Sequence, residues 1–278
     1  MNDSFVNAIN TQAATRNWMD GIGENMMNCY TPGYRENKQN FRTYMGGCAP
    51  DSVLKSTGQG KSTPGTADEN VYLEGKGFFV IRDSKGKIAY TRLGEFKFDG
   101  EGMYKTADGK RVQGYILNDK GEIMQGTKPM DADIFTESAL NGGSVQIPTT
   151  DIKLWIDPGN GKFLGKYEEF EIKEDGILYG KADKGKVKTP LYKLAVMNFH
   201  NPQELFEIKP GQFIETAESG KPVIGRGDVR GGLIEMSNAG LGGNINFWKM
   251  AQIQMKVADK LVQTNKQLLQ QAIDLMSN

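Results

Sequence analysis

The residue best suited to acid–base chemistry in this sequence is His200, the only histidine among 278 residues. A lone histidine excludes metal sites that need several imidazoles and leaves one candidate general base. No nucleophile motif such as Gly-x-Ser-x-Gly accompanies it. Its position directly before Asn201 and Pro202 is typical of a turn. We therefore interpret His200 as a turn residue rather than a catalytic one.

Neighbouring carboxylates are the second kind of residue that could carry a reaction. A pair of them could hydrolyse a glycosidic bond, and nearby aromatic rings could stack on a sugar. The pairs are Asp99 with Glu101, Glu168 with Glu169, and Glu174 with Asp175, and the rings are Trp155, Tyr167 and Phe170. Unpaired carboxylates ordinarily lie in turns and on surfaces, and aromatic residues between strands are typical of a sheet core. We expect those structural roles, and no catalytic residue.

A glycine-rich segment and two cysteines complete the residues with potential chemistry. Residues 58–62 (GQGKS) resemble the end of a phosphate-binding loop, but Lys55 stands where the opening glycine is needed. Cys29 and Cys48 belong to no Cys-x-x-Cys pair, which favours two reduced structural thiols over a bridge. The sequence thus predicts no metal, no cofactor, no small-molecule substrate and no enzymatic activity.

Composition and charge exclude several classes of protein. Lysine plus arginine equals aspartate plus glutamate at 34 each, so no net field recruits nucleic acid or an anionic membrane. No apolar run approaches the ~18 residues of a membrane helix. The chain opens with Asn2, Asp3 and Ser4 and has no basic residue before Arg16, which is wrong for a cleaved secretory signal. We expect a globular protein that is cytoplasmic or exported without a cleaved signal.

The two ends of the chain are patterned as long helices, unlike the segment between them. Residues 244–278 contain no glycine or proline, and apolar or small residues recur at alternating spacings of three and four. This spacing predicts a coiled-coil seam. The seam consists of Trp248, Ala251, Met255, Ala258, Val262, Asn265, Leu269, Ala272 and Met276. A second stripe of Val257, Leu261, Leu268 and Leu275 widens the apolar face, so we expect several neighbouring helices.

Residues 4–28 form the matching helix at the N-terminus, which Pro32 and Gly33 end. Its apolar series, the expected assembly face, is Phe5, Ile9, Ala13, Ile22 and Met26. Two such helices flanking a β-rich body can pair with each other but can hardly bury every apolar face within one chain. The sequence therefore predicts assembly with further copies.

The middle of the chain is patterned as short strands separated by hairpin turns. The strand candidates are 71–73, 77–82, 87–91, 95–98, 103–106, 112–117, 145–147, 152–156, 177–179 and 191–199, followed by an irregular glycine-rich stretch from 200 to 232. We expect an α+β protein with a discontinuous coiled-coil domain from both termini and an antiparallel, barrel-like middle domain. The predicted divisions are 1–45 (N-terminal helix and turn), 46–70 (connector), 71–232 (β-rich domain) and 233–278 (C-terminal helix).

Four stretches of the sequence resemble the bacterial flagellar rod and hook family. They are 24–35 (ENMMNCYTPGYR), 74–98 (EGKGFFVIRDSKGKIAYTRLGEFKF), 194–205 (LAVMNFHNPQEL) and 211–238, which contains GQFIETAESGKP and GGLIEMSN. They follow the order of the family between terminal helices, so the resemblance covers nearly the whole chain. The matching positions are Asn25, Asn28, Thr31, Pro32, Gly33, Tyr34, Gly75, Gly77, Phe78, Phe79, Tyr90, Thr91, Arg92, Gly94, Phe96, Asn201, Pro202, Glu215, Thr216, Ser219, Gly220, Glu235, Ser237 and Asn238.

The resemblance implies an axial structural subunit of the flagellar basal body, exported without a cleaved signal by the flagellar type III apparatus. The implied partners are further copies of itself in a helical tube, other rod and hook subunits, basal-body ring proteins and the export apparatus, in the cell envelope and periplasm. The chain lacks room for the outer domains of most hook proteins, which favours a rod subunit. A short 36–70 segment and the sequence Gln-Met-Lys at 254–256 point toward proximal rod relatives, while distal rod and small hook paralogues stay open.

Two departures from the pattern of the family concern packing around the terminal helices. Cys29 and Tyr30 stand where small or polar residues are expected, and residues 240–246 (GLGGNIN) replace an acidic first turn. Two other classes of protein remain as alternatives. One is a secreted β-domain binding module that oligomerises through its ends, and the other is an enzyme that acts on cell-wall glycan.

Overall fold

The structure, a computed structural model, describes residues 2–44, 47–125, 128–129, 149–154, 169–173, 175–182, 186–225 and 227–276. The chain divides into two compact units. The helical unit draws on Met1–Thr31, Arg35–Ser56 and Ser237–Asn278, and the β unit on Pro32–Tyr34 and Thr57–Met236. The two ends of the chain therefore belong to one and the same unit.

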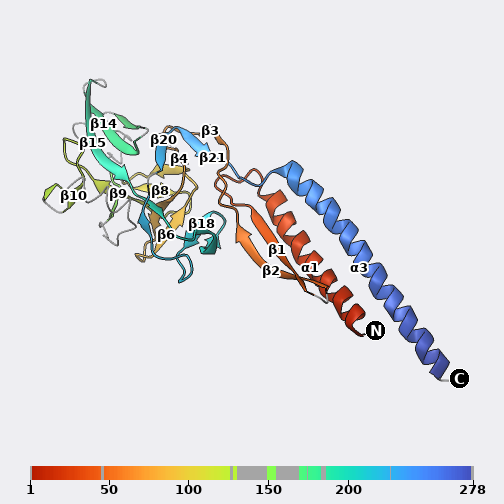
Figure 1. The fold of residues 1–278 in the computed structure, drawn as a ribbon. Coiled ribbons are helices and arrows are strands. Elements are labelled where there is room, and N and C mark those ends of the chain that lie inside the picture. The colour runs from red at the N-terminus through yellow and green to blue at the C-terminus, as the bar shows by residue number, and fades with distance from the viewer. Residues whose placement is uncertain are drawn as a thin grey trace. The chain divides into compact units, whose positions relative to one another are not determined.

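The helical unit contains two long helices that lie side by side (Figure 1). Helix α1 spans Asn2–Met27 and helix α3 spans Leu241–Met276, which confirms the predicted terminal helices. The helices are antiparallel, because Gln12 contacts Asp259 while Asn25, near the end of α1, contacts Asn244, near the start of α3.

Ser237 and Asn238 lie ahead of the first turn of the last helix. Ser237 Oγ accepts the N–H of Ala239 at 3.1 Å, and Asn238 Oδ1 accepts the N–H of Glu36 at 2.7 Å. Because α3 begins only at Leu241, these side chains order the approach to the helix rather than its first turn.

A hairpin completes the helical unit. Strand β1 (Asn37–Tyr44) pairs antiparallel with β2 (Gly47–Lys55). The composition of residues 46–70 indicates a connector, yet β2 lies within that range, as does β3 (Ser62–Pro64) of the β unit. Glycine, serine, threonine and proline suppress the alternating pattern by which a strand is recognised, so the pairing is invisible in the sequence.

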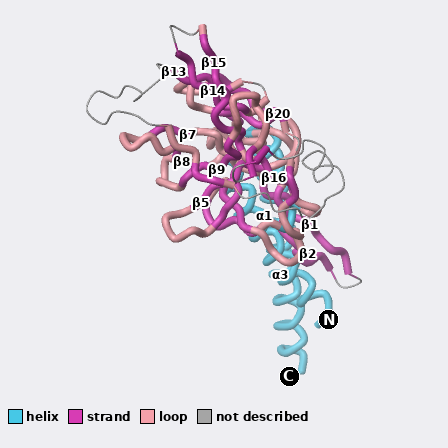
Figure 2. Tube along the Cα trace, turned by 90° about the vertical axis from the view of Figure 1, so that its left-hand side faces the viewer, coloured by secondary structure: helices cyan, strands magenta, loops and turns pink. Residues whose placement is uncertain are grey.

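The β unit is built from short antiparallel strands (Figure 2). Besides β3 they are β4 (Val71–Glu74), β5 (Phe78–Arg82), β6 (Ile88–Thr91), β7 (Phe96–Phe98), β8 (Tyr104–Thr106), β9 (Arg111–Ile116), β10 (Met124–Gln125), β11 (Lys128–Pro129), β12 (Thr150–Asp151), β13 (Glu169–Ile172), β14 (Ile177–Ala182), β15 (Val187–Leu194), β16 (Val196–Asn198), β17 (Phe206–Lys209), β18 (Gln212–Ile214), β19 (Val223–Ile224), β20 (Asp228–Gly231) and β21 (Leu233–Glu235), with one 3-10 turn, η1 (Pro202–Glu204). Strands β4 to β9 and β14 to β16 confirm the corresponding predictions.

The main sheet is open rather than closed. Its longest path runs β13-β14-β15-β9-β5-β6-β18-β17, and β3 and β4 pair separately with β21 and β20. Among the described strands β13 and β17 do not pair with each other, so the predicted barrel-like closure is not found there. The stretch 200–232, expected to be irregular, contains β17 to β20, which are too short to show a period of two. The candidate 145–147 and the last two residues of the candidate 152–156 lie outside the described residues, and residues 152–154 contain only an isolated bridge from Lys153 to Met103.

Strand β5 lies at the centre of the β unit, because both of its faces are covered. Successive side chains of a strand point to opposite faces. Accordingly Phe79 and Ile81 belong to one buried cluster, while Phe78 and Val80 belong to another. The uninterrupted apolar run of β5 is thus the pattern of a strand buried on both sides.

Candidate functional site: the helix pair and the motif cluster

The predicted seam of α3 is the face that α1 covers. Ala251 and Ala258 are 0% and 1% exposed. Trp248, Met255, Val262, Asn265 and Ala272 are partly buried, and two of the last three seam residues, Leu269 and Met276, are exposed. Most of the seam is therefore used within the chain, by the pairing of the two terminal helices.

Helix α1 contributes small and polar residues to this interface. Its buried side chains include Ala8, Thr15 and Ile22, spaced by seven residues, and Asn25. Of the predicted series, Ile22 is buried, Phe5 and Met26 are partly buried, and Ile9 and Ala13 are exposed. A search for apolar residues overlooks a seam of alanine, threonine and asparagine, although its period of seven is present in the sequence.

A second apolar face of α3 is exposed to solvent. We call it the outer stripe of α3, and it consists of Met250, Val257, Leu261, Leu268 and Leu275, which are 57%, 55%, 50%, 47% and 81% exposed. Four of these five residues form the second stripe predicted from the sequence. Exposed apolar side chains that gather on one face of a helix mark an interaction surface.

A buried ion pair joins two of the sequence motifs in the β unit. Arg92 Nη1 lies 3.3 Å from Glu235 Oε2, and the two side chains are 4% and 2% exposed. Arg92 also donates to the carbonyl oxygens of Leu73, at 2.9 Å, and Gly75. Glu235 Oε1 accepts the N–H of Gly60 at 2.8 Å. We call Arg92, Glu235, Leu73, Gly75 and Gly60 the motif cluster. The hydrogen bonds and opposite charges of this cluster offset the cost of desolvating both ions.

Three passages of the chain meet beside Glu235. The N–H of Gly33 donates to the carbonyl of Glu235 at 2.8 Å, and the N–H of Met236 donates to the carbonyl of Lys61 at 2.9 Å. The segments around residues 33, 60 and 236 adjoin the points where the chain leaves the β unit. The motif cluster therefore holds these exits of the β unit together.

Two motif glycines permit close backbone approach in the same region. Gly33 has a φ of +69°, and a Cβ built there would lie 2.8 Å from the nitrogen of Leu93. A Cβ on Gly94 would lie 1.7 Å from the carbonyl oxygen of Val71. No other residue fits at either position without displacing the backbone.

The aromatic motif residues form the core around β5. Phe79 packs edge-on against Phe96 with ring centroids 5.4 Å apart, and Phe78 packs in the same manner at 6.0 Å from Phe199. Tyr90 lies 4.8 Å from the Phe199 ring. Burial, and then the charge of Glu215, raises the pKa of Tyr90 far above its usual value, so the hydroxyl stays protonated.

The remaining motif residues order turns. Asn28 Nδ2 donates to the carbonyl of Glu24 at 2.9 Å, and Asn28 Oδ1 accepts the hydroxyl of Thr31 at 3.1 Å. Thr216 and Ser219 exchange backbone-to-hydroxyl hydrogen bonds of 2.9 and 3.0 Å. The N–H of Asn201 donates to the carbonyl of Ser219, and the hydroxyl of Thr91 donates to the carbonyl of Gly211. Pro202 is the first residue of η1, and Tyr34 is buried. Gly75 and Gly77 precede β5, and Gly220 has a positive φ.

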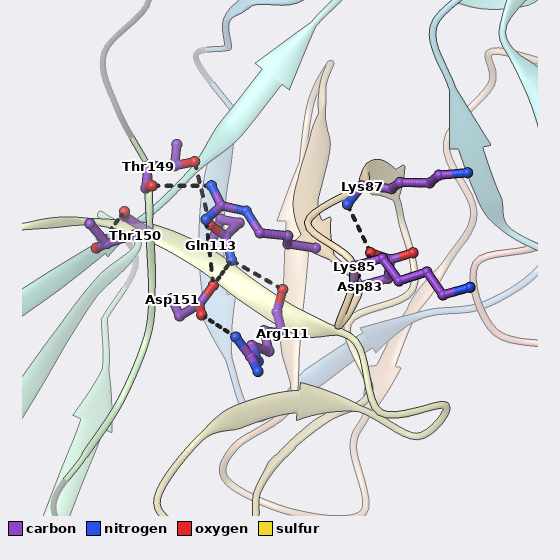
Figure 3. Close-up of polar contacts among 10 residues, drawn as sticks. Asp83, Lys85, Lys87, Arg111, Gln113, Thr149, Thr150 and Asp151 are labelled. Carbon is purple, nitrogen blue, oxygen red and sulfur yellow. Dashed lines mark hydrogen bonds and ion pairs between the residues drawn. The ribbon is translucent and has the colours of Figure 1, made fainter.

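A polar site that the sequence did not indicate anchors β12 to β9 (Figure 3). Asp151 Oδ2 lies 2.9 Å from Arg111 Nη1, and its Oδ1 accepts the side-chain amide of Gln113 at 2.6 Å. Arg82 lies 4.0 Å from the same carboxylate. Burial opposes ionisation of Asp151, but the bonds from Gln113 and Arg111 and the two arginine charges outweigh it and lower the pKa of Asp151.

In the described part of the chain, the candidate catalytic residues do not come together as an active site. Asp99 and Asp175 accept turn N–H groups, His200 lies in an exposed bend, and Phe170 packs 5.1 Å from the Phe98 ring. Glu168, Glu174, Trp155 and Tyr167, with the side chain of Glu169, lie outside the described residues. Within the described residues no three His, Cys, Asp or Glu side chains gather as metal ligands, and Cys29 is a free thiol. None of the described helices is both long and apolar enough to cross a membrane.

Comparison with known proteins relates both units to flagellar components. Residues 72–180 match the family described as the flagellar hook protein FlgE/F/G D1 domain. The chain is 25% identical to the flagellar basal-body rod protein FlgG of Bacillus subtilis, with 92% of each chain covered, and 24% identical to FlgG of Borreliella burgdorferi, with 90% of each covered. The flagellar hook protein FlgE of Borreliella burgdorferi is 28% identical, but the chain spans only 43% of its length. The domain match and these relatives support the bacterial flagellar basal-body rod and hook proteins as the family that the chain resembles.

Proposed function

We propose that this chain is a rod subunit of the flagellar basal body that polymerises helically into an axial tube through α1 and α3. The tube transmits torque and passes exported subunits. Support comes from the relatives, because the chain matches FlgG rod proteins over 92% and 90% of their length but much less of a hook protein. In this role the chain is structural and needs no catalytic step.

The outer stripe of α3 is the observation that carries the proposal. Helix α1 occupies the seam of α3, so the outer stripe is free to meet helices of other subunits as part of a larger coiled coil. Burying one such valine or leucine stabilises an assembly by about 1.5–3 kcal/mol. Contacts between unlike faces of successive subunits then generate an open helix rather than a closed ring.

The remaining parts of the chain have supporting roles in this proposal. Helices α1 and α3, within the predicted divisions 1–45 and 233–278, supply the assembly faces, and the β unit forms the β-rich body. Neighbours along the axis are other rod and hook subunits, with ring proteins around the body. The subunit reaches the periplasmic basal body through the flagellar export apparatus without a cleaved signal.

Isolation of basal bodies tests this function. An epitope-tagged copy that restores swimming to a deletion strain should be recovered in detergent-purified basal bodies, and the deletion strain should yield basal bodies without a complete rod. Recovery of the tagged chain only as a free secreted protein, with intact rods in the deletion strain, would instead favour the binding-module alternative.

A further inference from the structure

Two asparagines are buried in the interface between α1 and α3. Asn25 is 2% and Asn244 is 1% exposed, and both occupy positions of the heptad pattern on their helices. Buried amides in a helix interface destabilise it unless their hydrogen bonds are made. Their presence between alanine-rich faces therefore calls for a specific role.

The hydrogen bonds of these asparagines are fully used. Asn25 Nδ2 donates to Asn244 Oδ1 at 3.2 Å and to the carbonyl of Asn37 at 2.9 Å, while Asn25 Oδ1 accepts the N–H of Asn37 at 2.8 Å. Asn244 Nδ2 donates to Glu36 Oε1 at 3.1 Å and to the carbonyl of Gly240 at 2.9 Å. Both hydrogens of each amide thus have a partner, and the network includes the first residues of the hairpin.

The heptad spacing of the small residues in the interface is compatible with more than one alignment. Ala251 and Ala258 are seven residues apart in α3, as are Ala8, Thr15 and Ile22 in α1. A slip of one heptad would keep these positions on the facing sides of both helices, so their spacing alone does not select one alignment. The same slip would set Asn25 against Ala251 and leave its amide without Asn244.

We propose that the Asn25–Asn244 pair fixes the register of α1 against α3 and, through Glu36 and Asn37, the position of the β1–β2 hairpin. A buried asparagine pair selects one register because every slipped register leaves desolvated amide groups unbonded. This inference goes beyond the proposed function, since it concerns the folding of one chain and holds whether or not the chain polymerises.

Disulfide trapping in the full-length chain measures the register directly. In a background of Cys29→Ser and Cys48→Ser, the pair Gln12→Cys with Asp259→Cys reports the register of the structure, where Gln12 Nε2 lies 2.5 Å from Asp259 Oδ1. Pairing Gln12→Cys with Gln252→Cys or Lys266→Cys reports a slip of one heptad in either direction. Each pair is oxidised under mild conditions, and the cross-linked fraction is read from gels.

The test variants are Asn25→Leu with Asn244→Leu, and Asn244→Leu alone, which keeps the bonds of Asn25 to the hairpin. The matched control is Asn10→Leu with Asn246→Leu, the same substitutions at exposed positions of the same helices. We expect the parent and the control to form the native cross-link almost exclusively. The ratio of slipped to native cross-link should rise by about tenfold or more in the double variant, and less in the single one.

Three results would overturn the proposal. The first is an unchanged ratio in both test variants. The second is a double variant that loses its helical circular dichroism and forms neither cross-link, because the asparagines would then be needed for pairing itself rather than for register. The third is a parent chain that forms no native cross-link. The assay requires no assembly, so it can fail while the rod function stands.

Discussion

Arg92 and Glu235 form a buried ion pair across 143 residues of sequence, with 3.3 Å between Nη1 and Oε2. Each charged group also bonds the backbone of a further segment, so the pair replaces the water that both ions lose on folding. The pair joins two of the stretches that resemble the flagellar family, 74–98 and 211–238, at the end of the β unit.

Removal of the Glu235 charge should therefore be costly. Glu235→Gln keeps the shape of the side chain but leaves Arg92 buried without its counter-ion, and we expect a loss of about 3–5 kcal/mol in the free energy of unfolding. The matched control is Glu74→Gln, which breaks an exposed pair with Arg230 and should cost at most about 1 kcal/mol. Urea unfolding measures the free energy of unfolding of both variants. Equal losses would show that the buried pair stabilises the fold no more than the exposed pair does.

Gly94 should tolerate no side chain. The Cβ of Gly94→Ala would lie 1.7 Å from the carbonyl oxygen of Val71, so the backbone must move and the Val71–Gly94 hydrogen bond is strained. We expect a loss of more than about 2 kcal/mol in the free energy of unfolding. Gly100→Ala is the control, because a Cβ there meets no atom within 4 Å. A tolerated Gly94→Ala would contradict the close approach of these two segments.

The strand β5 was predictable from the sequence, whereas the motif cluster and the seam of α1 were not. An apolar run such as Phe78 to Ile81 identifies a covered strand locally, through its unbroken hydrophobicity and its β-forming residues. The bond between Arg92 and Glu235 depends on where the chain returns after 143 residues, which no local pattern encodes. The seam of α1 was not predicted because alanine and threonine carry little hydrophobic signal, although the sequence contains their spacing of seven residues.

The site around Asp151 makes stability depend on pH. Because its pKa is lowered in the folded chain, the folded state binds fewer protons than the unfolded state once the pH approaches the ordinary aspartate value of about 3.9. The contribution of Asp151 is complete above that pH and is lost as the pH falls through the lowered pKa. Unfolding free energies at pH 7 and pH 3 should differ less in Asp151→Asn than in the parent.

The control for this pH dependence is Asp119→Asn, at an exposed turn position. It should leave the difference between pH 7 and pH 3 close to that of the parent. If Asp151→Asn also preserved the full difference, the ion pair with Arg111 would not contribute to acid sensitivity.

Charge substitutions on the outer stripe of α3 test most directly whether the chain assembles through this face. Val257→Asp and Leu261→Asp alter side chains that are 55% and 50% exposed in the single chain, so folding should tolerate them. Burial of an unpaired carboxylate between subunits costs several kcal/mol, so assembly should not tolerate these substitutions. Gln263→Asp adds the same charge at an exposed position outside the stripe and is the control.

Two readouts are taken for each variant: helical content with thermal unfolding of the purified chain, and the yield of complete rods from cells that carry it. We predict near-parental folding for all three variants, normal rods with Gln263→Asp, and none with Val257→Asp or Leu261→Asp. Normal rods from both stripe variants would contradict assembly through the outer stripe of α3, and so would a control as damaging as they are.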